Sequence, residues 1–228
     1  RLQGDWSSDV CSSDLGDEVA GRITWGLTGS HNRNNAVAAL LAARHAGVPL
    51  ARGLVALSRF KSVKRRLELR GSAAGVNVYD DFAHHPTAIA TTLAGLRGKV
   101  GVGTRILAVI EPRSNTMKLG VMRDLLPASL SDADLVFGYA SGVDWDLVCA
   151  LAPLGDKVTV VDRIEDLVVR IAAAARPGDQ VLVMSNGAFG GIHDQLLAAL
   201  AVRQLSAGSG RPVTQRTAAS DKRSNNER

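Results

Sequence analysis

Short apolar runs alternate with helix-like stretches through the second half of the chain. Four of these runs are predicted strands that are apolar throughout rather than at every second position: "RILAVIEP", "ADLVFGY", "KVTVVD" and "QVLVMSNG". Strands of this kind occur in parallel sheets that helices cover on both faces. We therefore expect an α/β fold with a doubly wound, mostly parallel sheet over residues 67–204, begun by a hairpin of "LELRG" and "VNVYDD".

A different pattern precedes this region. "EVAGRITWGLTG" alternates apolar and polar residues, which predicts a strand that ends in a turn at Gly29. "HNRNNAVAALLAARHAGVP" has Ala and Leu at helical spacing, with Asn at its head and Gly47 and Pro49 at its close, as expected of a helix. A second helix is predicted over "PLARGLVALSRF", and the basic stretch "KSVKRR" follows it.

The two ends of the chain have unusual compositions. "GDWSSDVCSSDL" (Gly4 to Leu15) resembles the translation of a sequencing adaptor, so residues 1–15 are set aside from fold prediction; the alternative is a serine-rich leader. Residues 205–228 are rich in Ser, Asn and Arg and almost free of large apolar residues. Such a segment cannot bury enough apolar surface to fold, so we expect a disordered tail.

Composition narrows the possible functions. The 228 residues carry a formal net charge of +5, but much of that charge lies in the tail, and we expect no nucleic-acid partner. No apolar run reaches the roughly 18 residues that cross a bilayer, so no membrane role is expected either. The two cysteines, Cys11 and Cys149, are far apart and indicate no disulfide framework, which fits a reducing cytoplasm.

Three polar clusters follow predicted strands, where ligands gather in such sheets. The first is "YDDFAHHP", with Asp80 and Asp81 at the strand end. His84 and His85 are sequence neighbours whose side chains point in different directions, which disfavours a shared metal ion. Two uses of the aspartates remain open: one accepts hydrogen bonds from a ribose, or one caps the helix that begins near Pro86.

The other two clusters are "EPRSNTMK" and "SNGAFGGIH". In the first, Arg113 could hold a carboxylate through two parallel hydrogen bonds and Lys118 could add a charge, or the segment is a solvated loop. In the second, small residues at the start of the last helix could expose backbone N–H groups to an anion, or form a glycine-rich turn without a ligand. The segment is not a P-loop, because it lacks GK[ST].

Two further stretches carry candidate binding residues. "GSHNRNN" places Asn32 and Asn35 three residues apart, and therefore on one face of a helix's first turn. Helix capping accounts for one of them, and a second on the same face indicates a polar contact. The charge run of Lys61, Lys64, Arg65 and Arg66 is either a solvated face or, at a domain junction, a contact for phosphates.

Together these stretches resemble the Mur ligase family, the ATP-dependent enzymes that join amino acids or peptides to UDP-N-acetylmuramate. "GSHNRNNAVAAL", "RRLELRG" and "YDDFAHHPTAI" occur in the family's order and at similar separations, and the resemblance covers residues 22–202. It implies that residues 16–55 end a central ATPase domain and that residues 56–204 form the Rossmann-like C-terminal domain. The UDP-binding domain and the GTxGKT phosphate loop would then be missing, and the fragment alone would be inactive.

Within the family, "DDFAHHPTAI", "EPRSNTMKLG" and "MSNGAFGGIH" are most similar to the branch that acts in peptidoglycan recycling. That branch joins the murein tripeptide L-alanyl-γ-D-glutamyl-meso-diaminopimelate to UDP-N-acetylmuramate, using ATP and Mg²⁺. The alternative is the branch that adds L-alanine, which typically has Tyr-Gly where Phe82 and Ala83 stand here. A peptide-binding module without catalysis is a further alternative, whereas a dinucleotide-dependent oxidoreductase is disfavoured because no GxGxxG follows a predicted strand.

The resemblance also implies roles for individual residues. Asn32 and Asn35 would approach the adenine, Arg66 a phosphate and Asp81 the ribose, with His31, His84 and His85 near the nucleotide. The tripeptide would be held by residues of the last two polar clusters: Arg113, Asn115, Lys118, Asn186, Gly187, Gly190 and Gly191. No catalytic residue or metal ligand is expected in the fragment. Asp81 and the turn near Gly187 would line one crevice, and Ala188 would strain that turn if the position needed a positive φ.

Overall fold

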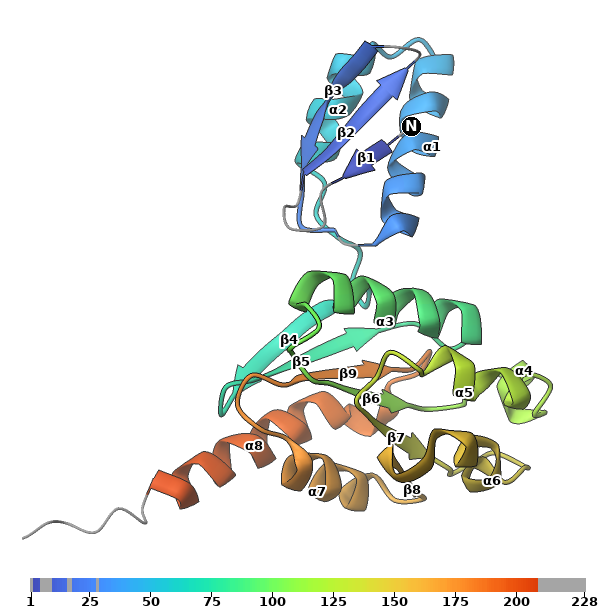
Figure 1. Cartoon of the computed structure of the whole chain (residues 1–228), viewed down its shortest axis with the longest axis vertical. Helices are drawn as coiled ribbons and strands as arrows, with labels where there is room; N and C mark the ends of the chain where they lie inside the picture. Colours follow the sequence, from blue (N-terminus) through green and yellow to red (C-terminus); the bar gives the residue numbers. More distant parts are fainter. Residues whose placement is uncertain (1, 5–9, 16–17, 28, 209–228) are drawn as a thin grey trace, which may run out of the picture.

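The computed structural model describes residues 2–4, 10–15, 18–27 and 29–208, which form two parts joined by one connection (Figure 1). In the first part, an antiparallel sheet has the strand order β1-β2-β3. Its elements are β1 (Leu2–Gly4), β2 (Val10–Leu15), β3 (Glu18–Thr24), α1 (Ser30–His45) and α2 (Leu50–Ser58). The described residues of the segment 1–15 therefore belong to one sheet with β3, in which β2 pairs with β3 and β1 with β2; whether that segment is a translated adaptor stays a prediction.

A small apolar core joins β3, α1 and α2 in the first part. Ile23 from β3, Leu40 from α1 and Leu54 from α2 are buried against one another, together with Trp25 and Ala36. Gly21 lies directly against Leu54 of α2. Because α2 ends at Ser58, the expected domain boundary at residues 55 and 56 falls inside this helix, and the connection to the second part follows it.

The second part is built on a six-stranded sheet with the order β4-β5-β9-β6-β7-β8. Only the edge strand β4 is antiparallel to its neighbour, and the other pairs are parallel. The expected mostly parallel sheet and its opening hairpin are confirmed. The strands are β4 (Glu68–Ala73), β5 (Val76–Asp81), β6 (Ile106–Ile110), β7 (Leu135–Tyr139), β8 (Val158–Val161) and β9 (Gln180–Met184).

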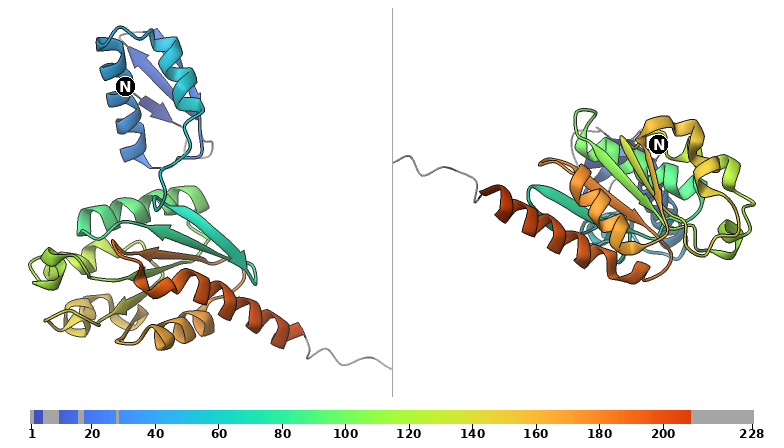
Figure 2. Two further views of the ribbon diagram at one scale, coloured as in Figure 1. Left: turned by 180° about the vertical axis from the view of Figure 1, so that it is seen from behind. Right: turned by 90° about the horizontal axis from the view of Figure 1, so that it is seen from below.

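Helices cover both faces of this sheet (Figure 2). One buried cluster packs α3, α5 and α6 on one face, and a second packs α7 and α8 on the other. Every residue of β6 and β9 is buried, as the uninterrupted apolar runs predict. The helices are α3 (Pro86–Val100), α4 (Asn115–Lys118), η1 (Arg123–Leu125), α5 (Leu126–Ser129), α6 (Leu147–Leu151), η2 (Ala152–Lys157), α7 (Ile164–Ala174), η3 (Phe189–Gly191) and α8 (Ile192–Gly208).

The strand register gathers the polar clusters at one edge of the sheet. Asp81 of β5 and Ile110 of β6 both pair with Met184 of β9, so the segments after these three strands leave the sheet side by side. Of the predicted tail, residues 205–208 belong to α8, and the rest lies outside the described residues. No helix in the described ranges is long and apolar enough to cross a membrane.

Candidate functional site

A cavity of about 870 Å³ is lined by residues of both parts of the chain and of the connection between them. Five residues that the sequence assigns to a nucleotide line it: His31, Asn32 and Asn35 on α1, Arg66 in the connection, and Asp81 at the end of β5. Asn32 and Asn35 share this cavity because three residues make almost one helical turn. The face of α1 predicted from this spacing therefore lines the cavity.

The rest of the lining suits a nucleotide. Trp25 and Phe60 provide aromatic surface, and Lys64 and Lys99 provide positive charge beside Arg66. Aromatic faces stack on nucleobases, and ammonium and guanidinium groups neutralise phosphates. The residues present therefore fit a nucleoside triphosphate.

His84 and His85 do not line the cavity. The Nδ1 atom of His84 lies 2.9 Å from the carbonyl oxygen of Phe82. His85 is the N-cap of α3, where its Nδ1 accepts a hydrogen bond of 3.4 Å from the Thr87 N–H. Of the two uses left open for the aspartates, capping of this helix is wrong, because His85 is at the N-cap position.

His31 is partly buried in the wall of the cavity. Burial lowers the pKa of His31; the nearby Asp81 carboxylate raises it, and Arg66 lowers it further. Its Nδ1 atom is buried and has no hydrogen-bond partner among the described residues. A neutral imidazole with one uncommitted nitrogen at a cavity wall can exchange one hydrogen bond with a bound ligand.

Asp81 is 3% exposed and is bonded mainly to the protein. Its Oδ2 accepts a hydrogen bond of 2.7 Å from the Leu67 N–H. Its Oδ1 accepts bonds from the Ala83 N–H at 2.8 Å and from the Thr92 hydroxyl at 3.3 Å. A carboxylate has about four acceptor positions, so three donors leave roughly one for a ligand. Asp81 can therefore accept a single hydroxyl from the cavity side.

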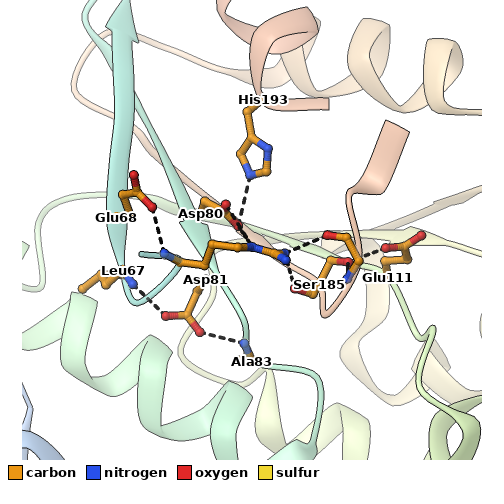
Figure 3. A network of polar contacts seen from close by, with 10 residues as sticks. Leu67, Glu68, Asp80, Asp81, Ala83, Glu111, Ser185 and His193 are labelled. Atoms are coloured by element: carbon orange, nitrogen blue, oxygen red, sulfur yellow. Dashed lines mark hydrogen bonds and ion pairs between the residues drawn. The ribbon is translucent and has the colours of Figure 1, made fainter. Parts of the chain in front are cut away.

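Asp80, next along β5, faces the opposite side of the sheet because side chains alternate along a strand. It forms an ion pair with Arg65, whose Nε lies 3.2 Å from Oδ2 (Figure 3). The Arg65 Nη2 donates to the carbonyl oxygens of Ser185 at 2.6 Å and Gly187 at 2.8 Å. His193 on α8 lies 3.4 Å from Asp80 Oδ1. This cluster of Arg65, Asp80, Ser185, Gly187 and His193 is called the Arg65 network below.

The Arg65 network was not predicted from the sequence. Arg65 and Arg66 look alike in a run of basic residues, and no sequence signal shows which of them turns toward β9. Successive side chains of a strand point to opposite faces of the sheet, so Asp80 and Asp81 must lie on opposite faces. This is the one sequence signal that could have separated their roles. The spacing alone leaves both aspartates open for the same two tasks, and only the resemblance assigns the ribose to Asp81.

The turn after β9 holds a different set of the expected residues. Ser185 accepts a hydrogen bond from the Gly187 N–H at 2.9 Å and bonds to Glu111, so this N–H is already used within the turn. The Arg113 guanidinium lies directly against Gly187, where a Cβ would come within 2.1 Å of Nη1. The buried Oδ1 of Asn186 has no hydrogen-bond partner in the described part of the chain.

Strain in this turn falls on other residues than the one expected. Ala188 has φ −75°, which any residue adopts, so alanine causes no strain there. The positive φ values belong to Phe189 (44°), Gly190 (56°) and Gly191 (70°). The Gly191 N–H donates to the Ala188 carbonyl, and Gly190 packs against Ile164 of α7. Gly190 and Gly191 therefore shape the turn.

The expected single crevice is two separate regions in the structure. Asp81 borders the cavity, whereas none of the turn residues 185–191 lines it, although β5 and β9 are neighbours. Asn115 and Lys118 lie on the short helix α4, which the Ser114 side chain caps. Among the described residues, no three His, Cys, Asp or Glu side chains are placed to hold a metal ion, so no Mg²⁺ ligand is assigned.

Comparison with known proteins places this geometry in a family. A family profile described as "Mur ligase, glutamate ligase domain" matches residues 65–187, which include Arg66, Asp81, Arg113 and Gly187. The chain belongs to the Mur ligase family. The expected resemblance is confirmed, and the mostly parallel sheet is the family's fold.

Members of the family share both sequence and structure with the chain. It is 48% identical over 220 residues to the UDP-N-acetylmuramate–L-alanyl-γ-D-glutamyl-meso-2,6-diaminoheptandioate ligase of Escherichia coli (strain K12), covering 90% of this chain and 47% of that protein. A UDP-N-acetylmuramate–L-alanine ligase of Mycobacterium sp. (strain JLS) is 36% identical over 207 residues, covering 85% of this chain and 42% of the relative. The solved murein peptide ligase of Psychrobacter arcticus 273-4 matches with a TM-score of 0.66 and 38% sequence identity. The match covers 88% of this chain and 44% of that one. The chain thus spans about half the length of the Mur ligases it matches.

Proposed function

We propose that the chain is part of an ATP-dependent ligase that joins L-alanyl-γ-D-glutamyl-meso-diaminopimelate to UDP-N-acetylmuramate. The observation that carries the proposal is the cavity in which Asn35, Arg66 and Asp81, from three separate segments, meet. The relative from Escherichia coli, whose name states this pair of substrates, supports the same reading at 48% identity. We propose that the reaction takes place in the cytoplasm.

The proposed reaction has two steps. The carboxylate of UDP-N-acetylmuramate attacks the γ-phosphorus of ATP, which gives an acyl phosphate and ADP. The alanine amine of the tripeptide then attacks the acyl carbon, phosphate leaves, and the amine gives up a proton as the amide forms. Such a reaction depends on positioning the partners and on neutralising phosphate charge.

The residues of this chain would bind and orient the substrates. Asn32 and Asn35 would exchange hydrogen bonds with the adenine edge, Arg66 would neutralise a phosphate, and Asp81 would accept one ribose hydroxyl at its remaining acceptor position. Arg113, beside the turn at Gly187, would hold a carboxylate of the peptide through its planar fork. Mg²⁺ would offset phosphate charge, and no residue of this chain is assigned to hold it.

A chimera tests the proposal directly. Residues 18–208 replace the matching stretch of the Escherichia coli ligase, which supplies the remainder of the enzyme. We expect phosphate release that requires ATP, UDP-N-acetylmuramate and the tripeptide, and a loss of roughly tenfold or more on Arg66→Ala, as removal of a charge-assisted contact predicts. The matched control is Arg170→Ala, an exposed arginine on α7.

The outcomes separate the alternatives. Release that L-alanine supports and the tripeptide does not would assign the chain to the other branch of the family. A folded chimera that binds the tripeptide without any nucleotide-dependent turnover would support a binding module instead. The 228-residue chain contains no GTxGKT stretch, so we expect no turnover from it alone, and phosphate release by the unfused chain would refute that expectation.

A further inference from the structure

Three residues of the connection, Arg65, Arg66 and Leu67, have an unusual backbone. Arg65 has φ 59° and Leu67 has φ 49°, so two left-handed residues that are not glycine flank Arg66. Residues with a side chain adopt this conformation only where surrounding contacts hold them in it, and such positions cluster at functional sites. The contacts that hold this segment therefore determine where the Arg66 side chain lies.

Backbone contacts fix both neighbours of Arg66. The Leu67 N–H donates to Asp81 Oδ2 at 2.7 Å, and the Arg65 N–H donates to the Glu68 carboxylate at 2.8 Å. The Arg65 carbonyl accepts a bond of 2.9 Å from the Phe82 N–H. Arg66 is thus held between two residues that are themselves bonded to the end of β5 and the segment after it.

The Arg65 side chain extends this support to β9. Its guanidinium bonds to Asp80 on one side and to the carbonyls of Ser185 and Gly187 on the other, and it lies 5.0 Å from the centroid of the Phe82 ring. The same ring lies 5.9 Å from the Arg66 guanidinium carbon. Adjacent arginines therefore serve two regions: Arg66 lines the cavity, and Arg65 holds the turn on which Arg113 rests.

We propose that Arg65 is a positioning residue that joins the nucleotide cavity to the turn after β9, so that a nucleotide and a carboxylate-bearing peptide bind with positive coupling. Consecutive Cα atoms are about 3.8 Å apart, so a shift of the turn that pulls on the Arg65 guanidinium must also move Arg66 or break the bonds between them. A peptide that orders the turn also orders Arg66. The inference rests on the proposed function for the identity of the two ligands.

Coupling of this kind is reciprocal and can be measured without turnover. The dissociation constant of a non-hydrolysable ATP analogue is measured on the 228-residue chain with and without saturating tripeptide. We expect the tripeptide to tighten the analogue by about fivefold or more in the parent chain. In Arg65→Lys, a single ammonium cannot span Asp80 and two carbonyls, and the ratio is expected to fall to about one.

Two more variants complete the experiment, one as a second test of the coupling and one as its control. Asp80→Asn removes the charge that holds the Arg65 Nε, and it is also expected to lower the ratio of the analogue's dissociation constants without and with tripeptide. If Arg65→Lys does not fold, Asp80→Asn tests the coupling in its place. Arg170→Lys, on the exposed side of α7, should keep the parent ratio. A parent ratio of one, or a folded Arg65→Lys or Asp80→Asn chain that keeps the parent ratio, overturns the inference. If the parent chain binds neither ligand, the ratio is measured in the chimera, and a folded chimera that binds neither ligand contradicts the proposed function instead.

Discussion

Gly187 and Arg113 come from different strand ends and meet only in the folded chain. The resemblance to the Mur ligases implies that both bind the peptide, and the structure brings the guanidinium against the glycine where no Cβ would fit. A family motif can predict that both residues matter. It cannot predict that they touch, because that contact depends on the order of β6 and β9 in the sheet.

The contact makes Gly187→Ala a specific probe of the peptide region. The new Cβ must displace the Arg113 guanidinium, which is exposed and able to move, so the fold should be little affected. In the chimera we expect the KM for the tripeptide to rise by about tenfold, the value of one charge-assisted contact, while the KM for ATP, measured at saturating tripeptide, stays unchanged.

Ala188→Gly is the matched control for this prediction, because Ala188 is exposed and has an ordinary φ of −75°. It should leave both KM values near those of the parent. A Gly187→Ala enzyme with an unchanged KM for the tripeptide would show that Arg113 is not a peptide ligand.

The helix and strand elements were largely predictable from the sequence. Uninterrupted apolar runs marked β6 and β9, and end signals marked α1, because those patterns follow directly from burial and helix termini. A helical stretch between β6 and β7 was predicted, but its division into the short helices α4 and α5 with a 3₁₀ turn between them was not. Their residues pack against α3 and α6, so tertiary contacts rather than local pattern decide their conformation.

The junction of α8 with β5 gives a prediction at the scale of elements. His193 of α8 is buried against Asp80; burial lowers its pKa, Asp80 opposes this, and the nearby Arg70 and Arg65 lower it further, while Asp194 raises it. The unfolded chain therefore binds more protons than the folded chain at pH values below about 6.5. The free energy of unfolding should fall as the pH is lowered from 7 through this range.

Urea denaturation at pH 7 and at pH 5 measures this effect. The stability lost between the two pH values should be smaller in His193→Gln than in the parent chain. His45→Gln, at the exposed end of α1, is the control and should lose as much stability as the parent. An equal loss in His193→Gln and the parent would show that this histidine does not carry the pH dependence.

The candidate nucleotide site exists only at the scale of the whole chain. Its residues come from α1, from the connection and from β5, and their convergence depends on how the two parts meet (Figure 1). Helical spacing put Asn32 and Asn35 on one face, but it could not say what that face meets. Resemblance to the Mur ligases supplied the pairing with Arg66 and Asp81. It did not supply the bonds that already occupy most of the Asp81 carboxylate.

The most direct test of this account is the dissociation constant of ATP for the 228-residue chain, measured by calorimetry. Asn35→Ala in the first part should weaken binding by about twofold to tenfold, and Arg66→Ala in the connection by about tenfold or more. Asn34→Ala, exposed on α1 and absent from the cavity lining, should bind like the parent. If either Asn35→Ala or Arg66→Ala binds ATP as tightly as the parent, the two parts do not share one nucleotide site.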